Sequence, residues 1–219
     1  MEKSRSPEEE ESILKEIERI LFPAYQPEFT ANGHDLYHIQ RMLKIAEKIV
    51  KNKEINIFLL KIAIWFHNID RTTFFNDQQR PKEEIVTDII HVLGLSKKEI
   101  ELIVDAVKKH NQLNYDSDST LLIYLKDIDR LDMGAIGIFR LIAHFPNLPP
   151  YKDSDFQKHT RSTAEKDLKS MTHNLQRCLE WENMLRIPQA KIFGKPRFAF
   201  MRQFFKELKK ELKEINIIS

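Results

Sequence analysis

Polar side chains with the chemistry of metal ligands interrupt apolar stretches at three places in this 219-residue sequence. His67 and Asn68 end an almost unbroken apolar run over residues 55–66, and His38 and Asp129 lie among apolar residues elsewhere. Burying such a group without a partner costs roughly 1–3 kcal/mol, so each must hydrogen-bond within the fold or bind something there. Two imidazoles and a carboxylate suit a divalent transition metal, whose open coordination positions would hold water or a substrate oxygen. The set therefore indicates a candidate metal site.

Helices are expected to bring these side chains together. Apolar residues recur at spacings of three and four, and strand-like alternation is nearly absent, so the predicted fold class is all-α. A helix over residues 34–51 carries His38 on the same stripe as Met42 and Ile45. The next helix, over residues 55–68, is apolar nearly all round, as in the centre of a bundle, and carries His67 and Asn68 inward. Convergence of polar residues from several helices is how bundles build metal sites.

The segment that carries Asp129 has two interpretations. Residues 121–125 have the composition of a strand, but a strand there would have no partner in this chain. We therefore predict a helix over residues 121–132. In that helix Asp129 and Asp132 share a face with Leu122 and Leu125, whereas Arg130 points elsewhere.

Further helices are predicted from the signals at their ends. Ser6 with Glu9, and Ser96 with Glu99, have the spacing of capping boxes. Gly94 stops a helix that begins at residue 82. A short apolar segment over residues 134–145 precedes a proline-containing loop over 146–155, for which the sequence leaves open a role in a lid or a partner surface. We then expect a helix over residues 163–185 and a last helix that is interrupted at residues 194–196, Gly-Lys-Pro.

Composition limits the partners and the location. Lys and Arg number 35 against 33 Asp and Glu, for a formal net charge of +2, which favours neither nucleic acid nor an anionic membrane. The first residues lack the apolar core of a secretory signal and no run reaches the length of a membrane span, so we expect a cytoplasmic protein. Cys178 is the one cysteine, which excludes an internal disulfide and a cysteine-rich metal site. Its apolar neighbours predict a packed thiol rather than a nucleophile.

Three motifs, in order along the chain, resemble those of the HD-domain superfamily of metal-dependent phosphohydrolases. They are Gly33-His34-Asp35-Leu36-Tyr37-His38, then His67-Asn68, then Asp127-Ile128-Asp129-Arg130-Leu131-Asp132 with Gly134-Ala135-Ile136-Gly137. More narrowly, the sequence is similar to the small, stand-alone bacterial members from about residue 33 to its end. The resemblance implies an HD-domain helical bundle that hydrolyses a phosphate ester, typically of a nucleotide, with a divalent metal ion. It does not distinguish Mn, Mg, Co, Fe and Zn.

The resemblance also suggests how the chain is organised. Residues 30–219 would form the HD-type phosphohydrolase domain, including C-terminal capping helices. Residues 1–29 would form an N-terminal helix and loop that pack on this bundle.

Carried over residue by residue, the metal ligands of the superfamily fall on His38, His67, Asn68 and Asp129. The family has a His-Asp pair where this chain has His67-Asn68. An amide oxygen is a neutral, weaker ligand that does not easily bridge two cations, so we expect a single-metal site with weakened metal binding and activity. A zinc clamp of His34 with His38 at i and i+4 is an alternative, but it lacks the glutamate of a metalloprotease.

Other side chains are expected to support this site. Arg130 and His110 are the candidates for contact with the substrate phosphate, although an ideal helix turns Arg130 away from Asp129 and His110 also fits an ordinary basic helix end. Asp70 is the candidate general base, with capping of the loop as its alternative role. Hydrogen bonds that orient the ligands are expected from His34, Asp35 and Asp132.

These features favour a metal-dependent phosphohydrolase that acts on a small phosphorylated compound, with a nucleotide as the first substrate class. The alternative is a catalytically silent HD fold that binds a nucleotide or a protein partner for regulation, and Asn68 is its whole motivation. A plain helical interaction domain would require His38, His67 and Asp129 to be unrelated core groups. The expected partner is the substrate, with no nucleic acid and no membrane. The sequence leaves the oligomeric state open, a homo-oligomer included.

Overall fold

The computed structural model describes residues 5–30, 33–51, 54–75, 80–156 and 170–218. Within these ranges the chain is helical, and its one β-type pairing is an isolated bridge between Thr30 and Thr72. The all-α prediction is therefore confirmed. The chain divides into two compact units, residues 1–128 and residues 129–219, a division that the sequence did not indicate. The separate N-terminal segment of residues 1–29 stays a prediction.

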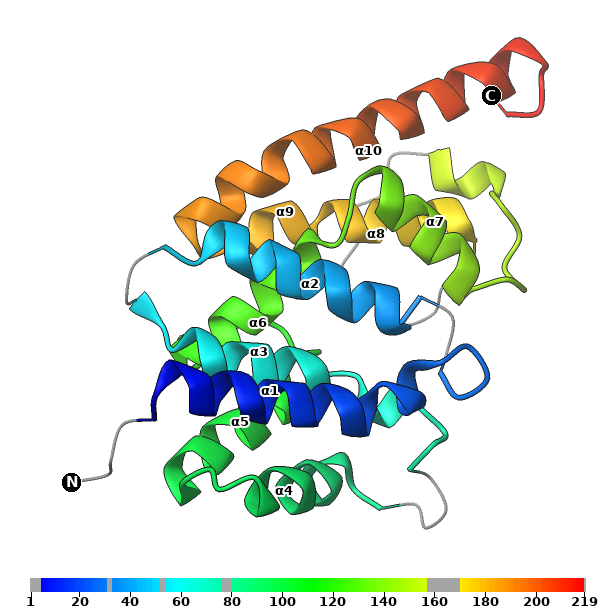
Figure 1. Ribbon diagram of the computed structural model, residues 1–219. Coiled ribbons are helices and arrows are strands. Elements are labelled where there is room, and N and C mark those ends of the chain that lie inside the picture. The colour runs from blue at the N-terminus through cyan, green and yellow to red at the C-terminus, as the bar shows by residue number, and fades with distance from the viewer. Residues whose placement is uncertain (1–4, 31–32, 52–53, 76–79, 157–169, 219) are drawn as a thin grey trace. The chain divides into compact units, whose positions relative to one another are not determined.

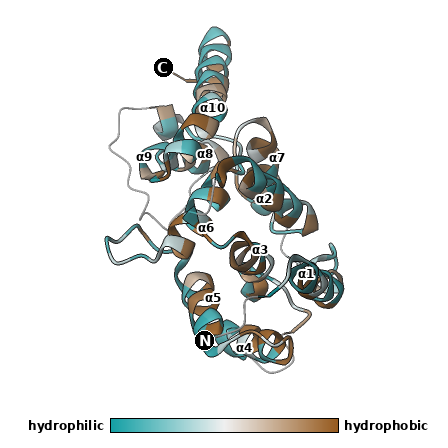
Figure 2. Ribbon diagram, turned by 60° about the vertical axis from the view of Figure 1, so that its left-hand side comes forward, coloured by the Kyte–Doolittle hydropathy of each residue, from teal (hydrophilic) through white to brown (hydrophobic). Residues whose placement is uncertain are grey.

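The first unit is built around a central apolar helix, α3 (Ile57–Phe66). It packs against α1 (Pro7–Leu21), α2 (Leu36–Ile49) and α5 (Lys97–Lys109), and α5 also packs against α4 (Lys82–Val92). Figure 1 shows α1 and α3 side by side, and α3 is largely brown in the hydropathy colouring of Figure 2. Because α3 is apolar nearly all round, it has neighbours on several sides. Two short 3₁₀ helices, Pro23–Tyr25 and Ile69–Arg71, follow α1 and α3.

The helix ends agree with most of the predicted signals. Both capping boxes form, at Ser6 for α1 and at Ser96 for α5. Gly94, with φ of +74°, follows the end of α4 in the left-handed conformation that glycine tolerates best. Helix α3 is shorter than predicted: its last residue is Phe66, and His67 is its C-cap.

Helix α6 (Thr120–Leu131) carries the Asp129 segment, so the helical interpretation of residues 121–132 is correct. Within the first unit, its Lys126 is buried and clamps the loop that connects α5 to α6. The Lys126 Nζ donates to the Leu113 carbonyl oxygen and to the Asp118 Oδ2, both at 2.8 Å. The side chains of this ion pair are 0% and 2% exposed. The loop is therefore held by a desolvated charge pair.

The second unit contains α7 (Ala135–His144), α8 (Met171–Leu179), α9 (Trp181–Met184) and α10 (Pro188–Glu214), with a 3₁₀ helix at Asp153–Phe156. Helix α10 packs against α7, α8 and α9, and α7 packs against α8. The loop predicted over residues 146–155 therefore ends in a 3₁₀ turn. The predicted helix over residues 163–185 begins outside the described residues. Its described part is two helices, α8 and α9, separated at Glu180.

The predicted interruption of the last helix at residues 194–196 is wrong, because α10 continues through Pro196. A Cβ atom on Gly194 would lie 2.8 Å from the Leu131 side chain and 3.0 Å from that of Leu185, so the glycine serves close packing rather than a break. Proline removes the N–H that would bond to the carbonyl of residue 192. Pro196 and Ile192 are both exposed, so water can hydrogen-bond to that carbonyl.

The packed-thiol prediction for Cys178 is confirmed. Its side chain is fully buried in the second unit. Desolvation by burial raises the pKa of this thiol to about 12. A thiol with such a pKa stays protonated at neutral pH and is a poor nucleophile.

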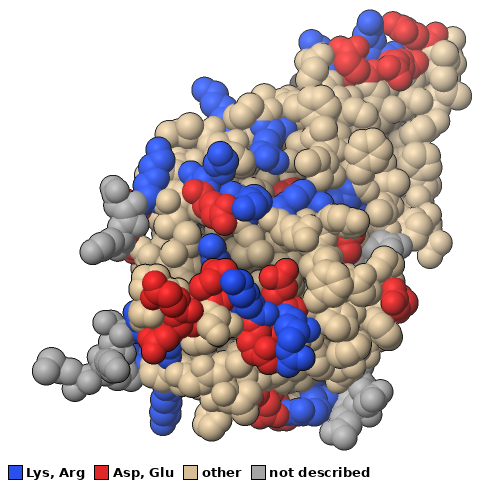
Figure 3. Space-filling view, in the orientation of Figure 1, with Lys and Arg blue, Asp and Glu red and all other residues tan. Residues whose placement is uncertain are grey.

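Two features relate to the expected partners, namely the charges on the surface and the lengths of the helices. On the face that Figure 3 shows, Lys and Arg side chains are interspersed with Asp and Glu side chains. None of the helices in the described part of the chain combines the length and the apolar character needed to span a bilayer.

The buried Lys126 gives a first testable prediction. Lys126→Met leaves the Asp118 carboxylate buried without its cation, so we expect the free energy of unfolding to fall by about 3–5 kcal/mol. Urea unfolding followed by circular dichroism measures this change. Lys210→Met is the control, because Lys210 and Glu214 form an exposed pair worth about 0–1 kcal/mol. Equal losses in the two variants would contradict the role of the clamp.

Candidate metal centre

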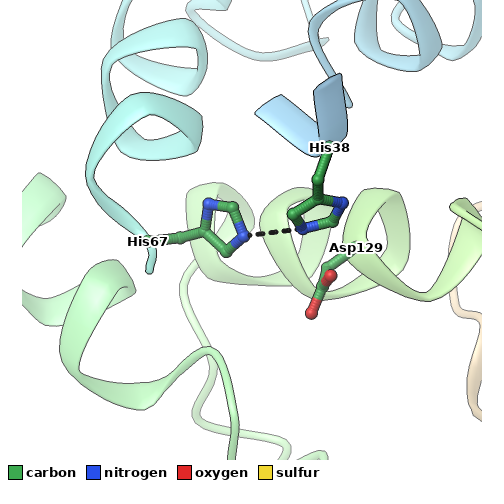
Figure 4. Close-up of side chains that lie close together, drawn as sticks. All are labelled: His38, His67 and Asp129. Atoms are coloured by element: carbon green, nitrogen blue, oxygen red, sulfur yellow. Dashed lines mark hydrogen bonds between the residues drawn. The ribbon is translucent and has the colours of Figure 1, made fainter. Parts of the chain in front are cut away.

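Three side chains from different helices meet in one cluster: His38 of α2, His67 at the end of α3, and Asp129 of α6. One ligand atom of each lies within 4.8 Å of the others. Figure 4 shows the three side chains and the contact between the two imidazoles. His38 and His67 are fully buried, and Asp129 is partly exposed. In the part of the chain that the structure describes, these three side chains form a group with the geometry to share an ion.

The separation of the two imidazoles fits metal binding. The His38 Nε2 lies 3.1 Å from the His67 Nε2. With metal–nitrogen bonds of about 2.0–2.1 Å, two nitrogens on one ion lie roughly 3.0–3.4 Å apart. The same distance also allows a direct hydrogen bond between the rings. Both imidazoles are thus placed to share either an ion or a proton.

A backbone contact determines the tautomer of His67. Its Nδ1 lies 2.7 Å from the Ile64 carbonyl oxygen. A carbonyl only accepts hydrogen bonds, so Nδ1 carries the hydrogen, and the Nε2 of the neutral ring keeps a lone pair. Metal-binding histidines are commonly oriented in this way, with the second ring nitrogen donating to a carbonyl or carboxylate. His67 therefore presents a donor atom to the cluster.

Asn68 lies between His67 and His34. Its amide nitrogen is 2.6 Å from the His67 Nε2 and 2.9 Å from the His34 Nδ1. Because the Nε2 of neutral His67 accepts hydrogen bonds, the amide must present its N–H₂ group rather than its oxygen. In this arrangement Asn68 donates to the same lone pair that a metal ion would use. The ligand role of Asn68, which requires Oδ1 to face the ion, stays a prediction.

Arg140 of α7 lies beside Asp129, and sequence reasoning missed it. Its guanidinium nitrogens are 3.5 Å from the Asp129 Oδ1 and 3.6 Å from the Asp132 Oδ2, and its side chain is 9% exposed. One signal was available, because Gly137 lies one turn before Arg140 on α7. A Cβ atom on Gly137 would come 3.2 Å from the Asp132 carbonyl oxygen. The glycine therefore lets the start of α7 approach the end of α6.

His110 is brought next to the cluster. It is the C-cap of α5, its ring centroid is 5.3 Å from that of His67, and its Nδ1 lies 2.8 Å from the Val107 carbonyl oxygen. Asp35 is the N-cap of α2, where its carboxylate accepts the backbone N–H of His38 at 3.0 Å. Asp35 thus positions the first turn of the helix that carries His38.

The structure shows contacts of Asp70 and Arg130 with residues outside the cluster. Asp70 is exposed and pairs with Lys82 at 3.4 Å. The Arg130 guanidinium is buried and donates to the Met184 carbonyl oxygen at 3.4 Å. The catalytic role of Asp70 and the phosphate contact of Arg130 stay predictions.

The fold has several relatives among known proteins. YpgQ, an uncharacterized protein of Bacillus subtilis, is 22% identical over 192 residues, which cover 85% of this chain and 88% of YpgQ. The structure of a Lactobacillus plantarum protein matches with a TM-score of 0.75 and 19% identity, over 93% of this chain and 98% of that one. The structure of YpgQ in complex with ADP matches with a TM-score of 0.65 and 20% identity, over 93% and 96%.

A structure described as an HD-superfamily hydrolase of Bacillus thuringiensis also matches, with a TM-score of 0.65 and 21% identity, over 94% of this chain and 97% of that one. These likenesses show a shared fold. The family model for the HD domain matches residues 35–134, a range that includes His38, His67 and Asp129. Residues 35–134 are therefore similar to the HD domain, as the motifs suggested.

Proposed function

We propose that this protein is a metal-dependent phosphohydrolase that acts on a small phosphorylated compound, with a nucleotide as the first substrate class. The observation that carries the proposal is the convergence of His38, His67 and Asp129 within 4.8 Å. The complex of the related YpgQ with ADP supports a nucleotide as the substrate class. The active protein would reside in the cytoplasm, as the sequence led us to expect.

The donor set fits a divalent ion. Two neutral imidazoles and one carboxylate contribute a single negative charge, which leaves a bound divalent ion with net positive charge and open positions. Imidazole suits Zn, Fe and Co, and carboxylate suits Mg and Mn, so the donors do not select one metal. A divalent ion held there supplies Lewis acidity toward a phosphoryl oxygen and a water of lowered pKa.

Residues of the chain orient the proposed ligands and place charge around the proposed ion. The bond from His67 to the Ile64 carbonyl orients one ligand. Asp35, the N-cap of α2, holds the helix turn that carries a second proposed ligand, His38. Asp70 is retained as the proposed general base, and His110 and Arg130 as proposed phosphate contacts.

Removing a ligand tests the metal site. We expect His38→Ala and Asp129→Ala to lose bound metal and to lower turnover at least about 100-fold, because each takes away a donor of the cluster. Elemental analysis of the purified protein measures the metal. Hydrolysis of nucleotides and of an aryl phosphate with Mn²⁺, Mg²⁺ or Co²⁺ measures the activity.

His91→Ala is the matched control, because His91 is exposed on α4. It should keep wild-type metal content and turnover. Stoichiometric metal in His38→Ala and Asp129→Ala would refute the site.

A second function, a catalytically silent nucleotide-binding protein, is favoured by Asn68. Its amide nitrogen lies 2.6 Å from the nitrogen of His67 that a metal would need. A protein of this kind would be stabilised by a nucleotide and would not hydrolyse it.

Substitution of Asn68 separates the two functions. Asn68→Asp removes the N–H donor and adds a negative charge, so we expect Mn²⁺ affinity to rise about 10- to 100-fold. Isothermal titration calorimetry measures it. Asn68→Ala then reports on the native amide: if Asn68 blocks the His67 lone pair, the affinity rises, and if Asn68 is a ligand, the affinity falls.

Equal affinities in wild type, Asn68→Asp and Asn68→Ala would show that position 68 does not control metal binding. Turnover that appears only in Asn68→Asp, with a nucleotide still raising the Tm of the wild type, would establish the silent binding protein instead.

A further inference from the structure

The outward face of α7 is apolar along its whole length. The five exposed residues of this helix, which we call the α7 stripe, are Ala135, Ile136, Phe139, Ile142 and Ala143. Phe139 is 76% exposed, and Ile136 and Ile142 are 48% and 51% exposed. The outward face of a surface helix is normally polar, and monomeric proteins seldom expose large continuous apolar patches. The α7 stripe therefore has the character of a contact surface.

The polar residues of α7 lie on its other sides. The Arg140 guanidinium lies 3.5 Å from the Asp129 carboxylate and 3.6 Å from that of Asp132. The His144 ring contacts the Phe145 ring, with their centroids 4.2 Å apart. The α7 stripe itself carries no charge and no side-chain hydrogen-bonding group. A strongly charged partner, such as nucleic acid or an anionic membrane, would therefore find no complementary charge on it.

The order of side chains along the α7 stripe is symmetrical about Phe139. Isoleucines stand three residues before and after it, and alanines stand four residues before and after it. If two copies of this helix pack antiparallel across a two-fold axis at Phe139, Ile136 of each copy meets Ile142 of the other. Each alanine likewise meets an alanine. A two-fold interface requires this reciprocal match between identical surfaces, and an unrelated partner does not.

From this symmetry and the uncharged character of the face, we infer that the α7 stripe is a homodimer interface, in which α7 packs antiparallel against α7 of a second copy of this chain. The inference does not depend on the metal site. A helix of ten residues presents a face about 15 Å long and about 10 Å wide, which is small beside the about 800 Å² per partner of a standard interface. The dimer is therefore weak and reversible, and its population depends on protein concentration.

Sedimentation velocity of the full chain, from about 1 µM to about 1 mM, measures the association. We expect the wild type to change from monomer to dimer across this range. Phe139→Ser removes the central contact of both copies, so the dimer should weaken at least about 10-fold. Val92→Ser is the matched control, because Val92 is 77% exposed on α4 and lies outside the stripe. It should associate as the wild type does.

A charge exchange tests the antiparallel register. Ile136→Lys alone, or Ile142→Glu alone, places an unpaired charge against an isoleucine of the other copy, so each single variant should stay monomeric. The double variant, Ile136→Lys with Ile142→Glu, brings each lysine against a glutamate, so association should return at least in part. In a parallel pair the same double variant would bring like charges together. Both positions are exposed, so circular dichroism should show wild-type folding in every variant.

Four results would overturn the inference. A wild type that stays monomeric up to about 1 mM has no such interface. A Phe139→Ser variant that associates as tightly as the wild type dimerises through another surface. A double variant that is as fully monomeric as the single variants excludes the antiparallel register. Binding of a monomeric wild type to phosphatidylcholine vesicles, lost in Phe139→Ser, would assign the α7 stripe to a membrane surface instead.

Discussion

The candidate metal centre depends on one hydrogen bond, from the His67 imidazole to the carbonyl of Ile64. Helix α3 is the apolar centre of its unit, so its last turn ends inside the protein, where water does not satisfy the terminal carbonyls. The His67 ring satisfies one of them and in doing so fixes its own tautomer. A requirement of helix termination thereby presents a ring nitrogen to His38 and Asp129.

The same arrangement recurs at the end of α5. His110 is the C-cap there, and its Nδ1 meets the Val107 carbonyl three residues earlier, as His67 meets Ile64. Since α3 and α5 pack together, the two imidazoles lie with their centroids 5.3 Å apart. Two helix ends in contact therefore deliver two oriented imidazoles, one to the cluster and one next to it. The phosphate contact of His110 stays a proposal.

The sequence predicted the structure correctly where interactions between neighbouring residues determine it. The capping boxes at Ser6 and Ser96, the stop at Gly94 and the helical periodicity around Asp129 all depend on nearby residues. Gly194 was misread because its role is set by the side chains that pack on it, and these come from distant parts of the chain. Arg140 was missed for a similar reason: only the packing of the second unit places it beside Asp129. The sequence around a residue does not show which distant residues will contact it.

The amide at position 68 and the guanidinium of Arg140 affect the charge of the cluster in the same direction. An amide rather than a carboxylate at position 68 leaves the cluster with one negative charge fewer, which would weaken its attraction for a divalent ion and its repulsion of a phosphate. Arg140 adds positive charge beside Asp129. Under the proposed function, such a centre would hold its metal less tightly, and repel a phosphate less, than one with a second carboxylate. Under the proposed function, a change at position 68 would therefore shift metal binding and phosphate binding in opposite directions.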